Sequence, residues 1–255
     1  MSYALAQGRL WTPWQRILSR CSAAALSTSL FLGSPCYSAT IQPTDMDIQT
    51  VQTAFRDFDL RRLTEADKEF SMAIDRWREL DRPRDEIVSL LKARANVRLD
   101  NKQFEPAIID YNEALDLMKV DGEKEDGTGR YPEYPDTFVG RGGAKEGLAD
   151  WKGALDDYNK AISLWGGGRG EGVNPYVLTY RGNVLTRMNR YEDAVLDYSA
   201  ASDRFNAMRD VARYSDSRAN LALALYETGK TDDAKKVHCL PYACGRQRSS
   251  AFTRL

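Results

Sequence analysis

The residue types that support catalysis or metal binding are scarce in this sequence. The only histidine, His238, adjoins Cys239, and Cys244 follows near the C-terminus. These side chains bind zinc when their spacing allows a tetrahedral site, but this spacing matches no zinc finger. The glycine-rich stretch 165–172 lacks the Lys-Ser/Thr of a phosphate-binding loop and matches no dinucleotide fingerprint. We therefore assign no catalytic residue, no metal site and no cofactor, and we expect that the protein is not an enzyme.

Charge is distributed unevenly along the chain, although the formal net charge is only −1. Residues 1–44 and 238–255 each contain three arginines and no acidic residue. Without these six arginines, 30 of the 36 basic residues remain against 37 acidic ones, so the body is acidic, near −7. An acidic body repels a phosphate backbone, which argues against nucleic acid as the partner.

The first 39 residues have the pattern of a targeting presequence, which we expect to be cleaved or disordered. A basic stretch ends at Arg20, an apolar run covers 23–33, and small residues follow at 38–39. The apolar run is too short to span a bilayer, so we predict no transmembrane span. It suits export across a membrane, which leaves the secretory and thylakoid routes both open.

A repeated pattern of small and aromatic residues organises the body of the chain. Each copy begins with a bulky residue and continues with Ala, an aromatic residue and a second Ala. The successive offsets are three, four and three residues, which places all four side chains on one stripe of a helix. The copies are Leu63-Ala66-Phe70-Ala73, Phe104-Ala107-Tyr111-Ala114, Trp151-Ala154-Tyr158-Ala161 and Tyr191-Ala194-Tyr198-Ala201. A small residue stands nine positions upstream of each copy, at Ala54, Ala95, Gly142 and Gly182. A stack of such helical hairpins can bury an apolar face that one hairpin cannot, so we predict an all-α hairpin array.

This spacing resembles the tetratricopeptide repeat, a helix–turn–helix unit of about 34 residues. The resemblance implies a right-handed superhelical stack of antiparallel helix hairpins over residues 47–237, with about four complete repeats and a partial fifth. The fifth copy begins near Ser215 and reaches Ala234, after which its aromatic position falls on His238. We expect residues 238–255 to form an aberrant, unstructured tail.

Two further patterns predict local contacts. In three successive hairpins an arginine precedes the small residue, and an aspartate 16 positions later precedes the aromatic residue. We expect at least two of these three arginine–aspartate pairs to form bidentate ion pairs. The pairs are Arg94 with Asp110, Arg141 with Asp157, and Arg181 with Asp197. Thr64 followed by Asp67 predicts a capping box at the start of a second helix, and Asn189 is the expected start signal before Tyr191.

The resemblance also implies a partner-binding groove along the first helices of the hairpins. In this family, positions 2, 5, 9, 12 and 13 of these helices face the groove. The corresponding residues are Lys92, Asn96, Val139, Tyr176, Thr179, Asn183, Thr186 and Arg187. A known use of such a groove is to clamp the C-terminal carboxylate of a chaperone peptide, and Lys92 and Asn96 match two of its five ligands. The other three fall on Gly140, Tyr176 and Tyr180, which do not match, so a peptide-binding co-chaperone is the alternative function.

Three regions look like a chloroplast protein of this repeat family from plants and algae. They are residues 55–59 together with 63–67, residues 131–140 and residues 163–170. This resemblance implies a thylakoid protein, either in the lumen or peripherally associated with the membrane, whereas secretion is the alternative location. It also implies a non-catalytic protein–protein interaction scaffold that assists assembly or maintenance of photosynthetic complexes. Its protein partners would be subunits of a photosystem or of another thylakoid complex.

Overall fold

The computed structural model describes residues 43–122, 129, 131, 134–166 and 173–238, and every regular element in these ranges is an α-helix. The chain divides into two compact units, residues 1–153 and residues 154–255, and each is described by itself. The predicted presequence, residues 1–39, lies outside the described residues. The predicted tail lies outside them as well, apart from His238, which ends the last helix.

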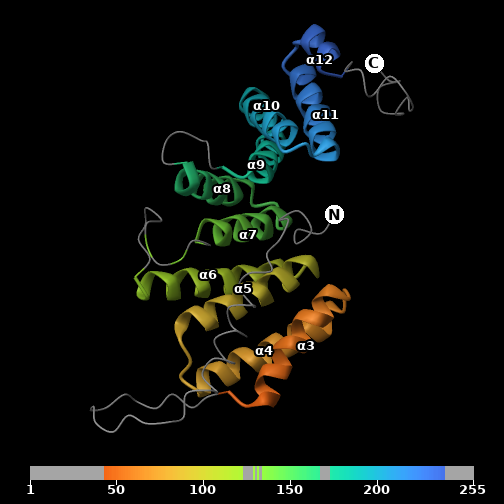
Figure 1. Ribbon diagram of the computed structural model, residues 1–255. Coiled ribbons are helices and arrows are strands. Elements are labelled where there is room, and N and C mark those ends of the chain that lie inside the picture. Colours follow the sequence, from red (N-terminus) through yellow and green to blue (C-terminus); the bar gives the residue numbers. More distant parts are fainter. Residues whose placement is uncertain (1–42, 123–128, 130, 132–133, 167–172, 239–255) are drawn as a thin grey trace. The chain divides into compact units, whose positions relative to one another are not determined.

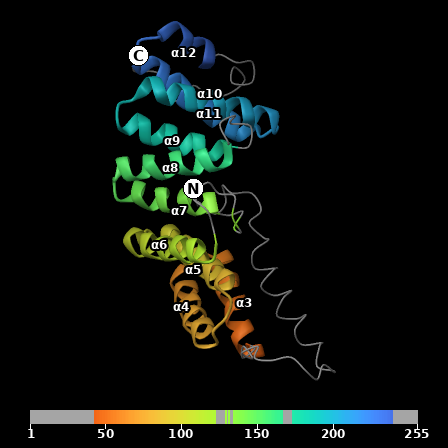
Figure 2. The same ribbon diagram turned by 90° about the vertical axis from the view of Figure 1, so that its left-hand side faces the viewer.

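The first unit is built from helices that pack against their neighbours in sequence. Its helices are α3 (Asp45–Asp59), α4 (Leu63–Glu79), α5 (Arg84–Asp100), α6 (Phe104–Val120) and α7 (Tyr134–Gly147). The α3–α4 and α5–α6 pairs each form a hairpin. Helix α4 also packs against α5, and α6 packs against α7 (Figures 1 and 2). The next helix, α8 (Trp151–Gly166), begins in this unit, and most of its length belongs to the second.

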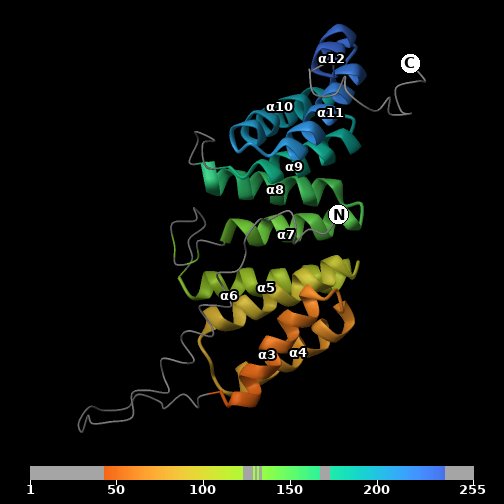
Figure 3. The same ribbon diagram turned by 45° about the vertical axis from the view of Figure 1, so that its right-hand side comes forward.

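The second unit continues the same pairing. After α8 come α9 (Pro175–Arg187), α10 (Tyr191–Ala207), α11 (Val211–Glu227) and α12 (Thr231–His238). Helix α10 packs against both α9 and α11, and α12 packs against α11 (Figure 3). The helix pairs α9–α10 and α11–α12 correspond to the fourth and fifth repeats expected from the sequence.

The alternating small and aromatic residues form the core of the hairpins, as the sequence predicts. The second helices begin at the four predicted bulky residues. The eight alanines of the four stripes are at most 1% exposed and the four aromatic residues at most 3%. A Cβ atom on Gly182 would lie 2.7 Å from Cε1 of Tyr198, so the absence of a side chain there admits the ring. The predicted all-α hairpin array is confirmed.

The short turns between helices share one backbone geometry. After α3 ends, Arg61 adopts a φ of 62°, and the Arg62 N–H donates to the Asp57 carbonyl oxygen at 2.8 Å. This bond, which closes over a left-handed residue, is the Schellman type of helix ending. Equivalent left-handed residues are Asp81, Lys102, Ala149, Asn189 and Arg209, and glycine takes the position in the last turn, at Gly229.

Both predicted start signals for the second helices are wrong because of this turn geometry. Arg62 is the N-cap of α4 and makes no side-chain capping bond, so Thr64 lies inside the first turn of the helix. Asn189 is the left-handed residue of its turn, with a φ of 57°, and Arg190 is the N-cap of α10. Asparagine tolerates this conformation better than most residues, which explains its place there.

The pairs Arg94–Asp110 and Arg181–Asp197 form, which confirms the expectation that at least two of the three would. Arg94 donates from Nε and Nη2 to the two carboxylate oxygens of Asp110 at 2.9 and 2.7 Å. Arg181 donates in the same way to Asp197, at 2.8 and 2.6 Å. The Asp110 carboxylate also accepts from Arg98 Nη1 at 2.9 Å and is only 1% exposed.

The arginines also reach back to the second helix of the preceding hairpin. Nη1 of Arg94 donates to the Ser71 hydroxyl at 3.0 Å, and Nη1 of Arg181 donates to Asn159 Oδ1 at 2.8 Å. Arg141 makes the equivalent bond to Asn112 Oδ1 at 2.7 Å. Each acceptor directly follows the buried aromatic residue of its stripe. One side chain therefore fixes the packing both within a hairpin and between consecutive hairpins.

Candidate functional site

Four of the predicted groove residues lie on one face of α9 in the second unit. Tyr176, Thr179, Asn183 and Thr186 follow one another at offsets of three and four residues, and all are half-buried. The hydroxyls of Thr179 and Thr186 donate to carbonyl oxygens four residues earlier, at 3.1 and 2.9 Å. Arg187, at the end of the helix, is exposed. The structure thus brings these α9 residues together on one surface.

A buried tyrosine holds the asparagine of this face in one orientation. The Tyr198 hydroxyl donates to Asn183 Oδ1 at 2.8 Å and lies 3.2 Å from Thr186 Oγ1. The amide oxygen of Asn183 therefore faces the core, and its –NH2 group is the part of the side chain that remains for a partner.

The first unit contains the same tyrosine–asparagine pair. The Tyr111 hydroxyl donates to Asn96 Oδ1 at 2.6 Å. Burial raises the pKa of Tyr111, so the hydroxyl keeps its proton and remains a donor. The signal for this pair is present in the sequence, since an asparagine follows the small residue and a tyrosine stands 15 positions later, but the pair was not among the predicted contacts.

Tyr176 is held by neighbouring helices of the second unit. Its ring packs edge-on against Phe205 of α10, with ring centroids 5.0 Å apart. The guanidinium carbon of Arg213, on α11, lies 5.4 Å from the centroid of the same ring. These two contacts fix the tyrosine between α10 and α11, so it forms a rigid edge of the α9 surface.

The predicted groove residues of the first unit have unequal access to a partner. Lys92 and Asn96 stand one turn apart on α5 and are half-buried. Val139 is 1% exposed, so its side chain offers almost no contact surface. A Cβ atom on Gly140 would lie 2.5 Å from Tyr111 Cζ, so a clamp asparagine does not fit at this position. The described residues therefore do not assemble the five-ligand carboxylate clamp.

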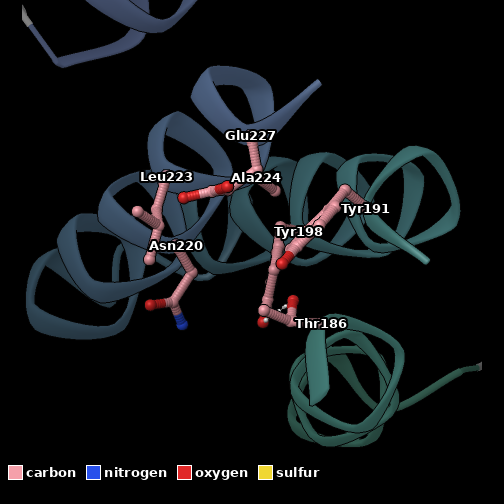
Figure 4. A pocket seen from close by; sticks show the side chains of 7 residues that line it. All are labelled: Thr186, Tyr191, Tyr198, Asn220, Leu223, Ala224 and Glu227. Carbon is pink, nitrogen blue, oxygen red and sulfur yellow. Dashed lines mark hydrogen bonds between the residues drawn. The ribbon is translucent and has the colours of Figure 1, made fainter. Parts of the chain in front are cut away.

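A cavity of about 110 Å³ opens beside Thr186 in the second unit. Tyr191 and Tyr198 of α10 stand on one side of it, and α11 supplies the opposite side (Figure 4). The residues from α11 are Asn220, Leu223, Ala224 and Glu227. Their spacing places them on one face of α11, and none of them is among the predicted groove residues.

Other kinds of site find little support in the described part of the chain. No group of three or more His, Cys, Asp or Glu residues within it is arranged to hold a metal ion. No helix in the same ranges combines the length and the apolar character that crossing a bilayer requires. The surface around α9 and its neighbouring cavity is therefore the candidate site.

Comparisons with known proteins define the class of fold. No model of a known protein family matches the sequence, and no curated protein matches it. Among solved structures, a kinesin light chain from Podosopora anserina with nearly identical TPR-like repeats is similar, with a TM-score of 0.59 and 10% identity. The match covers 74% of this chain and 90% of that one.

Two further solved structures have the same kind of similarity. BtubC (BKLC) from P. vanneervenii has a TM-score of 0.64 at 15% identity, covering 92% of this chain and 91% of its own. The apo form of RapI has a TM-score of 0.66 at 13% identity, covering 75% and 67% respectively. At such low identity these likenesses establish the fold alone. The chain has the fold of TPR-like helical repeat proteins.

Proposed function

We propose that this protein is a non-catalytic scaffold that binds protein partners and assists assembly or maintenance of photosynthetic complexes in the thylakoid. The observation that carries the binding role is the surface of the second unit around Thr186. There the ordered face of α9 meets an open cavity whose walls come from α10 and α11. Repeat folds of this type present extended surfaces to other proteins, which supports the same role.

The proposed thylakoid location rests on the similarity of residues 55–59 with 63–67, 131–140 and 163–170 to chloroplast repeat proteins. The proposed partners are accordingly subunits of a photosystem or of another thylakoid complex. The apolar segment at 23–33 suits an export route into the lumen.

The test is affinity purification of the tagged full-length chain from solubilised thylakoid membranes. We expect subunits of one photosynthetic complex to co-purify with the wild-type chain. Leu223→Asp places a charge on the cavity wall, where the leucine is 52% exposed, and should abolish this capture. Met208→Asp is the matched control, because Met208 is 61% exposed in the same unit and does not line the cavity.

Two results would contradict the proposal. One is equal capture by the Leu223→Asp and Met208→Asp chains. The other is recovery of photosynthetic subunits at no more than the level obtained with an unrelated tagged protein. Fractionation of the same cells tests location, and a chain found in the medium rather than in chloroplasts would favour the secretory route.

A further inference from the structure

The cavity beside Thr186 presents mainly hydrogen-bond acceptors. Tyr191 donates its hydroxyl proton to Asn189 Oδ1 at 3.0 Å, and Tyr198 donates to Asn183. The Thr186 hydroxyl donates to the Gly182 carbonyl oxygen at 2.9 Å. Each of these three hydroxyls thus donates its proton to another group of the protein. Their oxygens retain lone pairs and can still accept hydrogen bonds from a ligand. Among the lining side chains, only the Asn220 amide still offers donors.

Among the described residues, Glu227 is the only charged one that lines this cavity. Neither the Glu227 carboxylate nor the Asn220 side-chain amide has a hydrogen-bond or ion-pair partner among the residues that the structure describes. No arginine or lysine from the described part of the chain lines the cavity, so that part offers no countercharge to an anionic ligand. The combination of a carboxylate, hydroxyl oxygens and aromatic rings suits a cation.

The apolar part of the cavity limits the kind of cation that fits. Leu223 and Ala224 face Tyr191 and Tyr198 across the space (Figure 4). The volume, about 110 Å³, is several times the roughly 10–15 Å³ that a single water molecule needs. A bare metal ion would leave the apolar walls unused. A cation at the end of an aliphatic stem would use both the walls and the carboxylate.

We propose that this cavity binds a lysine or arginine side chain of the protein partner. This inference rests on the proposed binding role and names the chemistry of the anchoring residue. The stem of the lysine or arginine lies against Leu223 and Ala224. Its charged end meets the Glu227 carboxylate and the rings of Tyr191 and Tyr198. An acidic body is consistent with a basic segment on the partner.

The test is a nuclear magnetic resonance titration of the full-length chain with short glycine peptides, acetylated and amidated at their ends. Their central residue is lysine, arginine, norleucine or glutamate. We expect the lysine and arginine peptides to shift the signals of Tyr191 and Leu223, and the glutamate peptide to leave them unchanged. Norleucine has the stem of lysine without its charge, so it should bind more weakly.

The matched variants are Glu227→Gln and Glu192→Gln. Both glutamates are exposed in the second unit, and only Glu227 lines the cavity. Glu227→Gln should weaken binding of the lysine peptide about threefold, as expected for the loss of an ion pair to an exposed carboxylate, whereas Glu192→Gln should leave it unchanged. Circular dichroism of both variants checks that the fold is retained.

Equal affinity for the norleucine and lysine peptides, or equal binding by the two glutamate variants, would overturn the inference. A preference for the glutamate peptide would overturn it as well. These outcomes are separable from failure of the scaffold role. A wild-type chain that captures photosynthetic subunits but binds no cationic peptide retains the role and refutes this anchor.

Discussion

The carboxylate of Asp110 forms a buried electrostatic contact in the first unit. It accepts three hydrogen bonds, two from Arg94 and one from Arg98. The side chains of these arginines are only 12% and 17% exposed. Asp110→Ala would leave both guanidinium groups near the core without their common partner.

The expected cost follows from what each arginine retains. Removing one member of a buried ion pair typically costs about 3–5 kcal/mol, because a charge stays buried without compensation. Arg94 keeps its bond to Ser71, and Arg98 keeps a 2.7 Å bond to Asp67. These contacts offset part of the loss, so we expect a decrease of about 3 kcal/mol in the free energy of unfolding.

The assay is equilibrium unfolding in urea, followed by far-ultraviolet circular dichroism. Hydrogen exchange measured by mass spectrometry should locate the loss of protection in α5 and α6. Asp193→Ala is the control, because Asp193 pairs with Arg190 at 2.6 Å and both side chains are about half exposed. Exposed pairs contribute at most about 1 kcal/mol. If Asp110→Ala costs no more than this control, the ion pairs do not hold the hairpin together.

Two further substitutions should have opposite effects that both depend on pH. Burial and the charge of Asp57 raise the pKa of Glu69, so its ionised form opposes folding. Glu69→Gln should therefore raise the unfolding free energy at neutral pH, and this gain should vanish as the pH falls through the folded and then the unfolded pKa. Burial acts to raise the pKa of Asp47, but bonds from Thr44 and Arg76 outweigh it and lower that pKa. Asp47→Asn should cost about 0.3–1 kcal/mol at neutral pH, and the cost should disappear as the pH falls through the folded pKa. Urea unfolding at neutral and acidic pH checks both, and a difference unchanged by pH would contradict either explanation.

The sequence predicts the core more fully than the connections. Four helices begin at the expected residues, Leu63, Phe104, Trp151 and Tyr191. Small and aromatic residues at helical spacing indicate which face of each helix packs against its neighbour. The turn positions carry residues such as Arg61 and Lys102, which give no sign of a left-handed conformation. Long-range packing sets that conformation, at a cost of about 1–2 kcal/mol per residue.

The candidate site is less predictable for a related reason. The residues that share one face of α9 could be predicted from their helical spacing and from the resemblance to a known repeat. The cavity requires in addition that Glu227 of α11 lie across from Tyr191 of α10. That approach depends on the distance between two hairpins, which no local pattern of residues encodes. Val139 illustrates the same limit, since its burial depends on the surroundings of α7 and not on its position in the repeat.

The backward bonds of Arg94, Arg141 and Arg181 give the array a direction. The second, third and fourth hairpins each carry an arginine that bonds to the hairpin made before it, whereas the first and fifth have Thr53 and Leu221 at that place. A ribosome releases the chain in the same order, so each of these three arginines emerges after the hairpin that holds its acceptor. Hairpins can therefore dock one after another as they emerge, before the C-terminal half of the chain is made.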